Sequence, residues 1–178
     1  MKSLYIFIFI TMASFQISAQ KVEKVKWYTI DEALKLNATA PRKIMIDVYT
    51  DWCGWCKKMD AETFDNPVIA KYINANFYPV KFDAESSVTV KFGDHTFVNQ
   101  GNGGSRKSTH QFATALGVNG YPSVAYINGD LKVIGVVPGF FTPDKIEPLL
   151  HFIVDEKYQS IKLEEYEKTF AGELSKKK

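Results

Sequence analysis

Residues 44–57 read IMIDVYTDWCGWCK, a mostly apolar, β-prone hexamer followed closely by Cys53 and Cys56. The hexamer has the pattern of a strand that is buried on both faces. A helix-forming run comes next, so both sulfurs are expected on one face of a first helical turn, close enough to close a small ring. The chain has two cysteines, which leaves none for a separate structural disulfide. The stretch therefore indicates thiol-disulfide redox chemistry.

The flanking sequence predicts an α/β fold in which strands and helices largely alternate. Thr29 to Glu32 has a capping-box pattern, and Asn66-Pro67 provides an N-cap followed by a first-turn proline. A mixed sheet with helices on both faces follows from this order. The predicted strands cover residues 25–28, 44–49, 77–82, 123–127 and 131–137, and the predicted helices begin near residues 29, 53, 66, 109 and 142.

Two segments lie outside this regular pattern. Residues 86–107 are interpreted as an insertion, in which 88–92 and 96–98 can pair across a Gly-Asp turn. The Gly- and Asn-rich run 101–108 superficially resembles a phosphate loop, but Arg106 stands before Lys107 where that loop requires glycine, so a surface loop is expected. Residues 159–178 form a C-terminal extension with one short amphipathic helix, which leaves 20–158 as the main domain.

The first nineteen residues have the pattern of a secretory signal peptide. Lys2 precedes an apolar run over 4–10, and Ser18-Ala19 is a small-residue cleavage site. A membrane anchor is the alternative, but a span needs about 20 predominantly apolar residues. Cleavage near Ala19 predicts a mature protein that does not span the membrane and is periplasmic or secreted.

The composition is that of one globular domain. Hydrophobic residues make up 46% of the chain, and 22 basic against 20 acidic side chains give a net charge of +2. This balance provides no basic groove, so nucleic acid is not an expected partner.

Three motifs together resemble a thioredoxin-fold protein: Asp47, WCGWCK at 52–57 and GYPS at 120–123. The resemblance covers about residues 44–153. More narrowly, DVYTDWC at 47–53, with Lys57, Asp60, Thr63 and Phe64, is similar to the periplasmic C-terminal domain of the transmembrane thiol:disulfide interchange reductase. The resemblance implies a thioredoxin fold with the insertion before the cis-proline loop. It also implies that the substrates are disulfide-containing proteins, that a membrane thiol is the electron donor and that no dissociable cofactor is needed.

The two cysteines are expected to have different roles. Cys53 would lie at a helix N-terminus, where free N–H groups and the helix dipole favour a thiolate, so it is the predicted nucleophile. Cys56, one turn deeper, would resolve the mixed disulfide. A structural zinc site is the alternative and needs two more ligands. His95 and His110 are farther apart than a usual ligand pair and His151 is remote, so no metal is predicted.

Asp47 and Asp60 are the candidate acidic site residues. A carboxylate in an apolar strand is costly to bury unless it is paired, neutralised or useful. The resemblance places Asp47 beneath Cys56, where a pKa raised by burial would let it accept the thiol proton; a solvated strand end is the alternative. Asp60 lies on the helical face of Cys56 and is predicted to modulate the cysteine pKa, unless it is simply an exposed helix charge.

The remaining candidates surround the dithiol. The resemblance implies a cis bond at Tyr121-Pro122 that presents the Tyr121 backbone to an incoming peptide and keeps metal out, although the residues alone leave a trans turn open. Trp52 and Trp55, on either side of Cys53-Gly54, are predicted to form an apolar docking rim, with core packing as the alternative for Trp52.

The predicted function is a disulfide reductase that acts through a mixed disulfide. Trp55 stands where typical thioredoxins have proline, which leaves the potential open between about −270 and about −120 mV. A dithiol oxidase or disulfide isomerase is therefore the second hypothesis. A redox-inactive docking or chaperone module is the third, and the retention of both cysteines argues against it.

Overall fold

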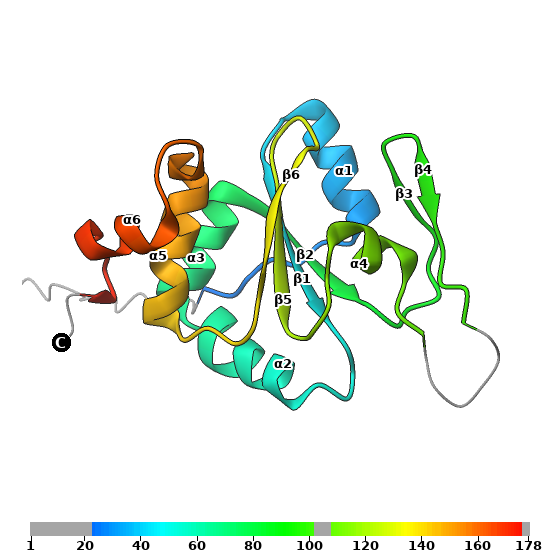
Figure 1. The fold of residues 1–178 in the computed structure, drawn as a ribbon, viewed down its shortest axis with the longest axis horizontal. Coiled ribbons are helices and arrows are strands. Elements are labelled where there is room, and N and C mark those ends of the chain that lie inside the picture. The colour runs from blue at the N-terminus through cyan, green and yellow to red at the C-terminus, as the bar shows by residue number, and fades with distance from the viewer. Residues whose placement is uncertain (1–22, 102–107, 176–178) are drawn as a thin grey trace, which may run out of the picture.

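A four-stranded sheet forms the centre of the computed structural model, which describes residues 23–101 and 108–175 (Figure 1). Strand β1 (Lys43–Tyr49) lies parallel to β2 (Phe77–Asp83) and antiparallel to β5 (Ser123–Ile127), which pairs antiparallel with β6 (Val133–Pro138). The strand order is β2-β1-β5-β6. The predicted mixed sheet is confirmed.

Helices cover both faces of this sheet, as Figure 1 shows. One face packs against α1 (Ile30–Thr39) and α4 (Gln111–Leu116). The other packs against α2 (Gly54–Met59), α3 (Pro67–Asn76) and α5 (Pro143–Val154).

The alternation of side chains along β1 separates these two cores. Ile44, Ile46 and Val48 belong to the core under α1 and α4, whereas Met45 belongs to the core under α3 and α5. Because successive side chains of a strand point to opposite faces, Asp47 lies on the Met45 face. The backbone thus directs a carboxylate towards the side of the sheet where α2 begins.

The predicted helix starts are confirmed. The Thr29 hydroxyl accepts a hydrogen bond from the Glu32 backbone N–H, while the Glu32 carboxylate accepts one from the Thr29 N–H at 2.8 Å. Asn66 caps α3 by accepting from the Val68 N–H at 3.0 Å, and Pro67 occupies the first turn. These bonds satisfy backbone donors that a helix start leaves unpaired.

The helix predicted from Cys53 to about Thr63 consists of two pieces. Helix α2 ends at Met59 and continues as a π-helical turn, η1 (Asp60–Phe64). Such wider turns occur frequently at functional sites. This one carries Asp60, so the change of helix type affects where that carboxylate lies relative to the strands.

The predicted pairing inside the 86–107 insertion is confirmed. Strands β3 (Val90–Phe92) and β4 (His95–Phe97) form a separate antiparallel ribbon. The fully buried His110 anchors it: its Nδ1 accepts from the Phe112 N–H, so its Nε2 carries the proton and donates to the Val88 carbonyl at 2.8 Å. The insertion is therefore fastened to the start of α4.

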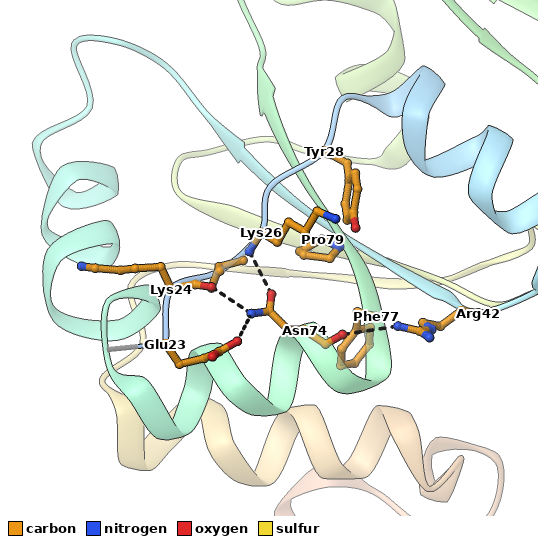
Figure 2. A pocket seen from close by; sticks show the side chains of 9 residues that line it. Glu23, Lys24, Lys26, Tyr28, Arg42, Asn74, Phe77 and Pro79 are labelled. Atoms are coloured by element: carbon orange, nitrogen blue, oxygen red, sulfur yellow. Dashed lines mark hydrogen bonds between the residues drawn. The ribbon is translucent and has the colours of Figure 1, made fainter. Parts of the chain in front are cut away.

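The strand predicted over residues 25–28 is largely wrong, because only Tyr28 pairs with the sheet, through a bridge to Val80. The residues before it are held by the Asn74 side chain, which accepts from the Lys26 N–H at 2.8 Å and donates to the Lys24 carbonyl at 2.8 Å (Figure 2). A side chain thus replaces the neighbouring strand. The cavity beside it, about 500 Å³, lies at the end of the sheet opposite the cysteines.

The C-terminal extension packs on α5 and contains the predicted short helix, α6 (Leu163–Thr169), after a 3-10 turn η2 (Lys157–Gln159). Beyond α6 the chain returns to α5, where the buried Glu147 carboxylate accepts from the Glu173 N–H at 2.7 Å and the Leu174 N–H at 3.0 Å. Two charge-assisted hydrogen bonds fix this end of the chain.

Some predictions fall on other parts of the chain. The proposed signal peptide, residues 1–19, and most of the 101–108 run lie outside the described residues. Within residues 23–101 and 108–175, no helix is both long and apolar enough to cross a membrane.

Candidate active site

Cys53 and Cys56 form a disulfide at the start of α2, immediately beyond the end of β1. Cys53 is the N-cap residue, and its sulfur accepts a hydrogen bond from the Cys56 N–H at 3.1 Å. A donor aimed at this sulfur, together with the other free N–H groups of the helix start, stabilises a thiolate there. The position of Cys53 at a helix N-terminus is thus confirmed.

Both cysteines are nearly covered, with 5% of Cys53 and 2% of Cys56 exposed. Cys56 is shielded, as predicted, but Cys53 is scarcely more open in the disulfide form. In this form, little of either sulfur is accessible to another molecule.

Asp47 lies in β1, with 1% of its surface exposed, and forms an ion pair with Lys81 of β2. The same ammonium also pairs with Asp60 of η1. The parallel register of β1 and β2 sets Asp47 directly beside Lys81. The solvated alternative for Asp47 is wrong. Asp60 is half-exposed and pairs with Lys81, and its effect on the cysteine pKa stays a prediction.

The burial of Asp47 raises its pKa from 3.8 to about 6, although Lys81 acts in the opposite direction. Desolvation lowers the pKa of Lys81, but its two carboxylate neighbours raise it above its usual value. Lys81 hence stays charged, while the pKa of Asp47 is about 6. Within the described residues, Asp47 Oδ1 has no hydrogen-bond partner.

The loop before β5 contacts Trp52, the residue next to Cys53, through the Tyr121 ring. The Tyr121-Pro122 peptide bond is cis, as the resemblance implied. The Pro122 carbonyl accepts from the Gly139 N–H at 2.8 Å, and the Ser123 hydroxyl donates to the Gly120 carbonyl at 2.8 Å. The turn is therefore tied both to itself and to the loop after β6.

Trp52 and Trp55 are exposed large hydrophobic side chains beside the cysteines, at 67% and 58%. The Trp52 ring contacts Tyr121 edge-on, with centroids 6.0 Å apart, and Trp55 contacts Phe140 at 5.5 Å. Core packing of Trp52 is wrong. Gly54, between the cysteine and the second tryptophan, is exposed with open space around it.

Sequence reasoning did not identify Lys81, Glu85 or Phe140. A lysine in the otherwise apolar stretch 77–82 was a usable signal, because it lies opposite Asp47 once the strands pair. Glu85 and Phe140 are in loops. Glu85 accepts a hydrogen bond from the Trp52 indole N–H and Phe140 contacts the Trp55 ring, and both contacts depend on tertiary structure.

The histidines considered for a zinc site are dispersed. His95 is in β4, His110 caps α4, and His151 in α5 stacks on Tyr72. Over the described part of the chain, no group of three or more His, Cys, Asp or Glu side chains is arranged to hold a metal ion.

The sheet topology and the Cys-Gly-Trp-Cys disulfide at the start of α2 define a thioredoxin-fold protein. The chain belongs to the Thioredoxin-like domain family, whose sequence profile matches residues 30–153.

Two curated relatives share part of this sequence. An uncharacterized Caenorhabditis elegans protein is 27% identical over 129 residues, which is 72% of this chain and 16% of the relative. The thiol:disulfide interchange protein DsbD of Pectobacterium atrosepticum is 24% identical over 112 residues, 62% of this chain and again 16% of the relative. The chain thus spans 16% of the length of either protein.

Solved structures support the fold. A thioredoxin from Thermus thermophilus aligns with a TM-score of 0.54 and 18% identity, over 72% of this chain and 85% of that one. A putative disulphide-isomerase from Bacteroides thetaiotaomicron gives a TM-score of 0.53 and 20% identity, over 76% and 97%. At these identities the likeness establishes the thioredoxin fold.

Proposed function

We propose that this protein is a disulfide reductase of the periplasm or the extracellular space. The observation that carries the proposal is the Cys53–Cys56 disulfide at a helix start on the sheet face that also buries Asp47. In the reduced protein, the Cys53 thiolate attacks a substrate disulfide and one substrate sulfur leaves as a thiolate. Cys56 then attacks Cys53, which releases the second substrate thiol and re-forms the protein disulfide.

Asp47 is the proposed acceptor of the Cys56 proton. A thiol must lose its proton to attack, and a carboxylate with a pKa of about 6 can accept that proton at neutral pH. In the disulfide state Cys56 has no proton to donate, which is consistent with the unpartnered Oδ1 of Asp47. Asp60 acts through Lys81: it shares the ammonium that limits how far the pKa of Asp47 rises.

Substrate binding is assigned to the Tyr121-Pro122 turn and the two tryptophans. The turn would offer the Tyr121 backbone for short strand-like pairing with an extended substrate segment. Trp52 and Trp55 would cover apolar substrate atoms around the reacting sulfurs. These roles require a partner protein with an accessible disulfide. They require no dissociable cofactor.

The proposed electron donor is a membrane thiol protein. A reductase outside the cytoplasm needs a source of electrons, and one relative is named as a thiol:disulfide interchange protein. The proposal that the chain is exported depends on the signal-peptide pattern of residues 1–19.

A dithiol oxidase or isomerase is the second candidate, because Trp55 in place of proline alters the helix start that stabilises Cys53. Titration of the mature protein against glutathione or dithiothreitol separates the two. A potential near about −270 mV supports the reductase, whereas one near about −120 mV supports the oxidase or isomerase.

The proposed cysteine roles have their own test. The Cys56→Ser variant should accumulate a mixed disulfide between Cys53 and a substrate, visible on a non-reducing gel and by mass spectrometry, and Cys53→Ser should not. If a variant with both cysteines replaced by serine kept full biological activity, the result would instead support the docking or chaperone module.

A further inference from the structure

Two small clusters of aromatic and charged side chains, some exposed and some half-buried, flank Cys53 in the structure. The first, called the acidic cluster, consists of Trp52, Tyr121 and Glu85. The Trp52 indole N–H donates to the Glu85 carboxylate at 3.0 Å while its ring contacts Tyr121. These partners come from the loop after β2 and the turn before β5. An indole that is 67% exposed is thus held from two sides.

The second, called the basic cluster, consists of Trp55, Phe140 and Lys58. The Lys58 ammonium lies 5.1 Å from the centroid of the Trp55 ring and 5.1 Å from that of Phe140. The two rings are themselves 5.5 Å apart. Lys58 also approaches Glu62 at 3.9 Å, but this pair is long and half-exposed, so it offsets little of the lysine's charge.

The clusters belong to one surface. Trp52 immediately precedes Cys53 and Trp55 follows it by two positions, and the loops that they contact are joined by the Gly139 N–H donating to the Pro122 carbonyl. Exposed aromatic rings that are already fixed in position lose little freedom on binding, which is typical of side chains that carry binding energy. Here the two rings have charges of different sign beside them: the negative Glu85 lies beside Trp52, and the positive Lys58 lies beside Trp55.

We propose that these clusters orient the substrate by charge. The partner is a protein segment with a cysteine in a disulfide, which carries a basic side chain on the Glu85 side of that cysteine and an acidic side chain on the Lys58 side. This inference rests on the proposed function of the Cys53–Cys56 pair. A segment in the reverse charge order meets like charges at both clusters and docks less often with its sulfur facing Cys53.

Single-turnover reduction of two synthetic peptides tests the proposal. Both have the same composition and one central cysteine held as a mixed disulfide with neutral 2-mercaptoethanol; one reads Lys before and Glu after the cysteine, and the other has the reverse order. The reduced protein, freed of other reductants, supplies the two electrons. Cys53 attacks the peptide sulfur, 2-mercaptoethanol leaves as a thiolate, and Cys56 then displaces the peptide thiol.

The measured quantity is the ratio of the reduction rates of the two peptides by the protein. It is divided by the same ratio measured with dithiothreitol as the reductant. This division removes the effect of charge order on the peptide cysteine itself. We expect a normalised preference of about three- to tenfold for one order at low ionic strength, which collapses in high salt. A ratio of one at low salt overturns the proposal.

A double variant tests whether the charges of Glu85 and Lys58 cause the preference. In Glu85→Gln the amide oxygen can still accept from the Trp52 indole, and in Lys58→Met the aliphatic stem remains over the rings, so the double variant removes mainly charge. It should bring the normalised ratio to one. The matched control is Glu164→Gln with Lys132→Met, both exposed and away from the disulfide, which should keep the wild-type ratio.

The outcomes separate this inference from the proposed function. If neither peptide is reduced, the reductase proposal fails. If both are reduced at equal normalised rates, or if the double variant keeps the wild-type preference, only the charge-orientation proposal fails.

Discussion

Replacing Asp47 with asparagine should stabilise the protein at neutral pH and weaken its redox function. The side chain is 1% exposed, and its burial raises the pKa from 3.8 to about 6. An ionised carboxylate at this position is therefore less stable in the folded protein than in the unfolded chain. Asparagine has nearly the same shape and cannot ionise.

The size of this effect follows from linkage. Each unit of pKa difference corresponds to about 1.4 kcal/mol, so a pKa that moves from 3.8 to about 6 makes ionised Asp47 destabilising by about 3 kcal/mol. Between these two pH values the folded state binds more protons than the unfolded state, so stability falls as the pH rises. The cost is absent below about pH 3.8 and complete above about pH 6.

Urea denaturation of the disulfide forms, at intervals from pH 3.5 to 7.5, measures the difference between wild type and Asp47→Asn. We expect the variant's advantage to grow from near zero at the acidic end to about 3 kcal/mol at neutral pH. An advantage that does not change with pH, or a variant less stable than wild type at pH 7, would refute the reasoning. The same variant should release substrate more slowly from the mixed disulfide above pH 6, because Cys56 would lack its proposed proton acceptor.

Three further substitutions have definite expected outcomes. Lys81→Met removes the cation nearest Asp47, so the carboxyl pKa should rise further above its value of about 6 in an NMR titration; no change would contradict the ion pair. Glu147→Gln weakens the bonds that hold residues 173–174 and should cost about 1–3 kcal/mol in denaturation, with faster amide exchange there and unchanged redox potential. His110→Ala should cost about 2–3 kcal/mol and speed exchange in the 90–97 ribbon relative to β1.

The elements that local sequence dictates were predicted well. Thr29 and Asn66 cap the helices that their positions indicated, because capping depends on side chains within three residues. The strand before the dithiol and the 123–137 hairpin follow from apolar runs and turn residues. The main failure, at residues 25–28, has a non-local cause: Asn74 of α3 provides the hydrogen bonds that a neighbouring strand would have provided.

Some residues of the candidate site could be recognised from the sequence, and others could be recognised only from the tertiary structure. Cys53, Cys56 and Asp47 stand out in the sequence because dithiols and buried carboxylates are chemically unusual. The charged and aromatic residues around them do not, because lysine at 81 and glutamate at 85 are ordinary until strand pairing and loop packing bring them close. The contacts of Trp52 likewise join residues 33 positions apart through Glu85. Long-range geometry of this kind has no local signature.

The network around Asp47 gives this destabilising carboxylate a pKa that suits its proposed role as a proton acceptor. Burial alone would push its pKa upward and leave the group protonated, unable to accept the thiol proton. Lys81 counters this, and Asp60 holds the same ammonium at the network's half-exposed side. The resulting pKa of about 6 lets Asp47 ionise at neutral pH and still bind a proton transiently. The proposed proton-transfer role of Asp47 would explain why the core keeps a cost of about 3 kcal/mol that selection for maximal stability alone would remove.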